Sequence, residues 1–276
     1  MSFFLLKMER LVFFLGLSFC LNCAAVLNAQ ISPEPREIKL TVHPGGQYRG
    51  TIRITNDSDE SLIVRAYFED LVFPPPFDGT KEFRPLGSTA ASCGKWITVL
   101  PSSFVLVPHG EQEVIYTINA PADVKGGYYG ILYFEKMNPP EAVEGLGMSL
   151  VYRFGSSFYL ETADSDKKAV IEALVPDKNS LKGDFKNTGD VIIFGRGTYQ
   201  VMDKDGILIS RGEFGKFSIP PKEKITFSVN DIRAASFGEK ADVIINFDLG
   251  DGELVVGEIE VTGDASGGLK ISALKN

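Results

Sequence analysis

Short runs of alternating apolar and polar residues, cut by turn residues, run along most of this chain. Between Trp96 and Pro140, apolar runs of strand length are separated by turns at Pro101, at 108–110, at Pro121 and at 126–127. β-Branched and aromatic residues dominate these runs, as is typical of strands. No window of helix length here repeats apolar residues at i, i+3 and i+4. The pattern predicts the middle of a β-sandwich.

The preceding residues add three strands, at 38–42, 48–56 and 62–72, and residues 148–161 form a long closing strand. In the second of these, Ile52 and Ile54 point one way and Arg53 and Thr55 the other, as in an antiparallel sheet with one wet face. About seven strands in roughly 130 residues predict an immunoglobulin-like sandwich. Residues 73–95 hold four prolines without periodicity, which predicts a long loop between strands.

A second series of strands fills residues 169–261, after a short polar boundary near 164. The two halves share sequence features: residues 51–59 match 181–190, and residues 104–119 match 217–230. We therefore expect an all-β chain with two tandem immunoglobulin-like sandwiches, at 30–163 and 164–262. A single helical turn is expected within 231–240, and a mobile tail of small residues at 263–276.

Residues 1–29 have the composition of a signal peptide. Lys7 and Arg10 precede an apolar run at 11–21, and small residues before Gln30 provide a cleavage site. A retained membrane anchor is the alternative, but the run is short for a bilayer span. A lipoprotein signal is another alternative, although no small residue precedes either cysteine of the segment. Export predicts a periplasmic or extracellular protein that is not inserted in the membrane after cleavage.

Composition narrows the classes of function. The net charge of −8 disfavours nucleic acid and anionic membrane as partners. Cys93 is the one cysteine after residue 29, so no internal disulfide can form, and we expect a buried or loop thiol. His43 and His109 lack a second ligand at metal spacing, and the clustered aspartates suit turns better than a calcium site, which stays the alternative. No catalytic or cofactor motif is present, so we expect neither an enzyme nor a bound cofactor.

Four features in order resemble the PapD-like periplasmic chaperones of pilus assembly. Arg36 precedes the first alternating strand, and a later strand ends in the turn at Asn56. A Pro–His–Gly turn then joins two strands after Trp96, and a penultimate strand ends in the pair at 139–140. The resemblance covers residues 31–161, whereas the second half is similar only as another sandwich.

The resemblance implies that the closing strand is donated to a partner subunit with an incomplete sandwich. Its alternating side chains would fill the partner's groove, although the same residues could instead complete the protein's own core. The side chains concerned are Leu150, Tyr152, Phe154, Phe158 and Leu160.

The family also anchors the partner's terminal carboxylate with two basic residues between its domains. Arg36 matches the first, but Ser156 or Ser157 stands where the second, a lysine, belongs. Arg153 is the nearest base, and two arginines suit a bidentate carboxylate clamp. Two solvated surface arginines are the alternative.

These features predict an exported, non-enzymatic protein that binds a pilin-like or other β-rich exported subunit by strand addition. The alternative is a structural or adhesive cell-surface module, in which tandem sandwiches act as spacers.

Overall fold

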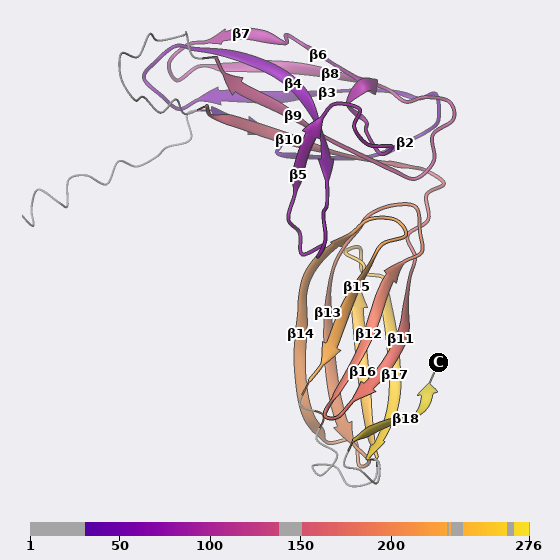
Figure 1. Cartoon of the computed structure of the whole chain (residues 1–276). Helices are drawn as coiled ribbons and strands as arrows, with labels where there is room; N and C mark the ends of the chain where they lie inside the picture. Colours follow the sequence, from indigo (N-terminus) through magenta and orange to yellow (C-terminus); the bar gives the residue numbers. More distant parts are fainter. Residues whose placement is uncertain (1–30, 138–150, 231, 233–239, 264–267, 276) are drawn as a thin grey trace, which may run out of the picture.

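A computed structural model describes residues 31–137, 151–230, 232, 240–263 and 268–275. The expected signal peptide, Leu150 and nearly all of the helical turn expected at 231–240 lie outside these residues. Two elongated β-sandwiches follow one another along the chain and are arranged as an L (Figure 1). The prediction of an all-β chain with two tandem immunoglobulin-like sandwiches is confirmed.

The first sandwich packs a four-stranded sheet, in the order β1-β3-β8-β6, against a sheet in the order β2-β10-β9-β4-β5, with β7 also paired to β4. Its strands are β1 (Ile31–Glu34), β2 (Glu37–Val42), β3 (Gln47–Asn56), β4 (Leu62–Val72), β5 (Glu82–Pro85), β6 (Ile97–Leu100), β7 (Ser103–Leu106), β8 (Glu111–Asn119), β9 (Gly127–Lys136) and β10 (Arg153–Thr162).

Alternation along the strands builds the first core. Ile52 and Ile54 of β3 are fully buried, and Arg53 between them is exposed and lies 3.7 Å from Glu111 on β8. On the facing sheet, Phe134 of β9 is fully buried in the same cluster. Strand β3 thus buries every second side chain, as the pattern predicted, whereas β9 buries residues 129–134 in succession.

The second sandwich pairs a three-stranded sheet, β11-β12-β15, with a five-stranded sheet, β14-β13-β16-β17-β18. Its strands are β11 (Ala169–Asp177), β12 (Ser180–Asn187), β13 (Ile193–Asp203), β14 (Leu208–Ile219), β15 (Lys224–Val229), β16 (Ala241–Asp248), β17 (Leu254–Gly263) and β18 (Leu269–Lys275). Its core centres on Phe247, which is fully buried and stacks on Phe185 with ring centroids 3.9 Å apart.

Strand β18 corrects the prediction of a mobile tail at 263–276. Residues 269–275 pair with β17, and Leu269 is buried in the second core. The glycines and serine before this strand resemble a tail in composition, but a short alternating run follows them. The run is stable as an edge strand because β17 supplies its main-chain partners.

The internal repeat is visible in two equivalent buried asparagines. Asn56 ends β3 and Asn187 ends β12, and the main-chain N–H of each donates to the residue just before the neighbouring strand of its own sheet, to Gly110 O at 3.0 Å and to Glu223 O at 2.9 Å. Each side-chain carbonyl accepts the N–H two residues later, from Ser58 at 3.0 Å and Gly189 at 2.9 Å. The matched segments therefore form the same turn in both sandwiches.

Residues 73–95 are more ordered than the predicted loop. They contain β5, which pairs with the end of β4, and a single 3-10 turn, η1 (Gly94–Trp96), begins just before their end. Buried Asp70 holds the returning chain by accepting from Thr89 N at 3.0 Å and Ser92 Oγ at 2.5 Å.

An apolar cluster joins the two sandwiches. Phe73 and Tyr159 of the first both contact Phe194 of the second, with ring centroids 5.4 and 5.2 Å away. The hydroxyl of buried Tyr129 accepts a hydrogen bond from Ile192 N at 2.7 Å. Residues 163–168 connect the last strand of one sandwich to the first of the other.

Candidate functional site

Strand β10, the predicted closing strand, has one edge paired along most of its length and the other edge paired only in its second half. Strand β9 pairs with it antiparallel from Arg153 to Glu161, but β2 pairs with it in parallel only from Ser157 onward. Before β2, the chain belongs to the opposite sheet as β1, which pairs with β3. Pro35 lies where the chain changes sheet. Because proline has no main-chain N–H, this position adds no unpaired hydrogen-bond donor. The edge of β10 at residues 153–156 therefore has no paired strand among the described residues.

The hydrogen-bond alternation shows which main-chain groups face this open edge. Ser157 N donates to Arg36 O at 2.8 Å on the β2 side, whereas Tyr152 O accepts from Lys136 N at 3.2 Å on the β9 side. Since these directions alternate along a strand, the N–H and C=O of Gly155 point to the open edge, as do those of Arg153. The edge offers a short ladder for an added strand.

The side chains expected to enter a partner divide into two groups. Phe158 and Leu160 are fully buried in the first core, so they complete this protein's own sandwich, the alternative considered from the sequence. Phe154 is partly buried against the same core, and Tyr152 is 38% exposed. Sequence reasoning missed Val151, which is 59% exposed beside the open edge, because it falls between the alternating positions.

Arg153 is held on the outer face of its sheet. Its Nη1 lies 2.7 Å from Glu69 Oε1, and its guanidinium stacks 4.2 Å from the centroid of the Tyr133 ring. The neighbouring Tyr67 hydroxyl, together with Glu69, raises the pKa of Arg153 above its ordinary value. Burial raises the pKa of Tyr133 to about 12.

Arg36 lies elsewhere. It is exposed and lines an open hollow of about 560 Å³ with Glu34, Pro35, Thr51, Arg53 and Glu113, beside the outer face of the four-stranded sheet. The structure therefore does not bring Arg36 and Arg153 into one site, because their side chains serve opposite sheets of the sandwich.

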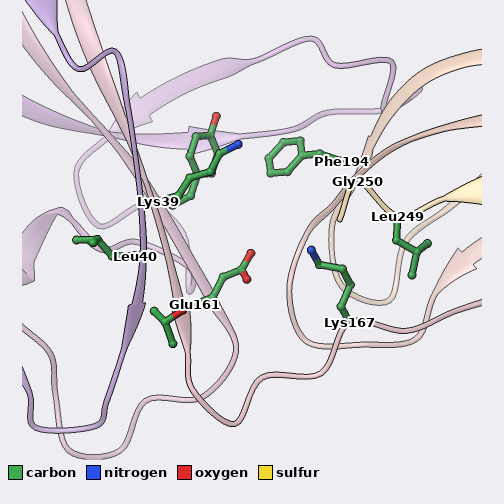
Figure 2. A pocket seen from close by; sticks show the side chains of 9 residues that line it. Lys39, Leu40, Glu161, Lys167, Phe194, Leu249 and Gly250 are labelled. Carbon is green, nitrogen blue, oxygen red and sulfur yellow. The ribbon is translucent and has the colours of Figure 1, made fainter. Parts of the chain in front are cut away.

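A second hollow, of about 250 Å³, lies between the sandwiches (Figure 2). Lys39 and Glu161 reach it from the first sandwich, Lys167 from the linker and Phe194 from the second sandwich. Lys167 Nζ pairs with Asp251 at 2.8 Å, and Lys39 Nζ lies 5.9 Å from the Tyr159 ring centroid. Sequence reasoning missed these residues because only the packing of the two sandwiches brings them together.

Two polar turns considered from the sequence are held by local contacts. His109 pairs with Asp59 at 2.8 Å, and Asp203 Oδ1 accepts the main-chain N–H groups of Asp205 and Ile207, both at 2.9 Å, in a turn. Within the described ranges, no group of three or more His, Cys, Asp or Glu side chains could hold a metal ion. No helix in that part of the chain has the length and apolar character needed to cross a bilayer.

Comparison with known proteins supports the fold. No protein-family model and no curated protein sequence matches the chain. Among solved structures, it is similar to a chain of a chaperone–tip adhesin complex of CFA/I fimbriae biogenesis, with a TM-score of 0.53 and 13% identity over 90% of this chain and 100% of that chain. It is also similar to the class 5 fimbriae chaperone CfaA, with a TM-score of 0.51 and 13% identity over 83% of this chain and 98% of that one. As the sequence resemblance predicted, the chain has the two-sandwich fold of the PapD-like fimbrial chaperones.

Proposed function

We propose that this protein is an exported, non-enzymatic chaperone that binds a β-rich exported subunit by strand addition along β10. The observation that carries the proposal is the edge of β10 at residues 153–156, which no described strand pairs, since β2 pairs only from Ser157 onward. Soluble β proteins ordinarily cover or shorten such edges, since exposed main-chain groups pair with other chains. An edge kept open by a change of sheet suits a protein that pairs with another chain as its function.

The binding energy would come from two sources. Main-chain hydrogen bonds to Arg153 and Gly155 would supply affinity, and side chains that alternate along the strand would supply selectivity. Tyr152 and Val151, at 38% and 59% exposed, are the side chains beside the edge that a partner can bury. Phe158 and Leu160 would support the strand from beneath rather than enter the partner.

Arg36 is the better placed of the two candidate carboxylate ligands. Its guanidinium is exposed, and Arg53 lines the same hollow. Arg153 would have to give up Glu69 and the Tyr133 ring before it could bind a carboxylate. In this proposal, Arg36 binds the partner's terminal carboxylate, and Arg153 keeps the start of β10 in place.

The test uses two substitutions at one exposed site. The alternation of β10, extended two residues before Arg153, directs the N–H of Val151 to the open edge, so Val151→Pro removes a main-chain donor, whereas Val151→Ala removes only side-chain area. Both variants and the wild type are used to isolate partners from the envelope fraction of exporting cells. A synthetic peptide of residues 148–161 is then added as a competitor for the bound subunit.

The proposal expects wild type and Val151→Ala to retain a small β-rich subunit that the peptide displaces, and Val151→Pro to lose most of it. Arg36→Ala is expected to weaken retention more than Arg153→Ala. If no such subunit is retained, or if Val151→Pro retains it as well as wild type, strand addition at this edge is wrong. A spacer or adhesive module on the cell surface would then be the better account.

A further inference from the structure

A segment of the first sandwich is built into the second. After β4, residues 73–81, here called the strap, run to the second sandwich and return as β5 (Figure 1). Phe77, near the middle of the strap, is 6% exposed and belongs to the core cluster of the second sandwich, together with Phe217 and Phe247. A side chain encoded before residue 164 thus helps to fill a core built otherwise from residues after it.

Main-chain contacts fix the strap against the second sandwich. Ser218 N on β14 donates to Phe77 O at 2.7 Å, and Phe77 N donates to Pro74 O at 3.0 Å. Phe77 has a φ of 65°, a left-handed conformation that costs free energy for a bulky residue. Burial of its ring in the second core compensates this cost, so the conformation depends on the second sandwich.

The two ends of the strap are anchored on the first sandwich. Phe73 is buried in the cluster at the junction, and its ring lies 6.3 Å from that of Tyr129. At the other end, Lys81 Nζ lies 5.6 Å from the Tyr159 ring centroid and 4.0 Å from Glu37. Strand β5 continues from there and pairs with β4, with Phe83 opposite Leu71.

We propose that the strap makes the stability of the second sandwich depend on the first. Unfolding of the first sandwich releases both anchors of the strap, so Phe77 leaves the second core and Ser218 N loses its acceptor. The two sandwiches then unfold as one cooperative unit, and the hollow between them keeps a fixed width. This coupling is separate from strand addition, because the strap and the open edge of β10 share no residue.

A double-mutant cycle on the full mature chain tests the coupling. Asn56→Ala weakens the first sandwich alone, and Phe77→Ala cuts the link. Hydrogen exchange of peptides that contain Phe185 and Phe247 reports on the second sandwich, and peptides around Phe134 report on the first. Leu86→Ala is the matched control, since Leu86 is 40% exposed and lies against Gly94 of the first sandwich.

With the strap intact, Asn56→Ala is expected to speed exchange in the second sandwich at least tenfold. In the Phe77→Ala variant, Asn56→Ala is expected to change the exchange rate of the second sandwich by no more than about twofold. Phe77→Leu should restore most of the coupling, and Leu86→Ala should leave it unchanged. The proposal is overturned if exchange in the second sandwich ignores Asn56→Ala while the strap is intact, or responds equally without Phe77.

Discussion

Asn187 should be among the most sensitive polar positions of the second sandwich. It is fully buried, and its Nδ2 donates to Val191 O at 2.8 Å and to Ile219 O at 2.9 Å. Its Oδ1 accepts from Gly189 N at 2.9 Å. The side chain therefore joins the end of β12 to the end of β14 and closes the turn that follows β12.

Asn187→Ala removes three hydrogen bonds and leaves their main-chain partners poorly solvated. Each bond contributes about 1 kcal/mol net, so the free energy of unfolding should fall by about 2–4 kcal/mol. Asn187→Asp should cost more at neutral pH, because a buried carboxylate would face two carbonyl oxygens. The folded state would raise the pKa of that carboxyl, so this variant should be most stable below about pH 4 and lose stability as the pH rises.

Urea denaturation followed by circular dichroism measures the effect, and Trp96, the one tryptophan, reports on the first sandwich by fluorescence. Asn119→Ala is the control, since exposed Asn119 accepts a single bond from Gln47 at 2.8 Å and its loss should cost less than about 0.5 kcal/mol. The hydrogen-bond account of Asn187 is refuted if Asn187→Ala and Asn119→Ala have equal stability.

Three further outcomes follow from buried groups. Burial raises the pKa of Tyr133 to about 12 and also raises that of Tyr129, so the free energy of unfolding should fall as the pH rises above about 10. Tyr133→Phe should make this fall less steep, and an unchanged slope of stability against pH would contradict the expectation. Cys93 is fully buried with a raised pKa, so a disulfide reagent should label it at least about 100-fold faster in urea than in buffer, and fast native labelling would count against its burial. Gly126→Ala should cost about 1–3 kcal/mol in a denaturation curve, because φ is +87° and a Cβ would lie 2.5 Å from Asp190 O; a neutral result would contradict that geometry.

The local pattern predicted most strands because the alternation of apolar and polar residues within a strand indicates which of its side chains are buried. The alternation around Ile52 and Ile54 places those side chains in the core whichever strands lie beside them. The likeness of the two halves was also readable, since Asn56 and Asn187 close the same turn with their own neighbouring residues. In both cases the information needed lies within a few residues of the feature.

Which strands pair with each other depends on residues far apart in the chain, and the candidate site is formed by such pairing. The closing strand was predicted from residue 148, and β10 begins at Arg153. Alternation alone could not separate Phe158, which fills the core, from Tyr152, which stays exposed, because both lie on one face. The open edge exists because the chain changes sheet at Pro35, and no local pattern shows which strand will cover which edge.

The strap shows a different limit of periodicity. A repeat of two or 3.6 residues arises when regular backbone presents one face to one core. The strap instead contacts the junction through Phe73, the second core through Phe77 and, where it returns as β5, the first sandwich through Phe83. Each aromatic residue packs against a different part of the protein. The sequence spacing of the three residues therefore depends on the distances between these parts, and not on the repeat of a regular helix or strand. A proline-rich segment with isolated aromatics can therefore be well ordered, and where two domains are adjacent such a segment is a candidate for the link between them.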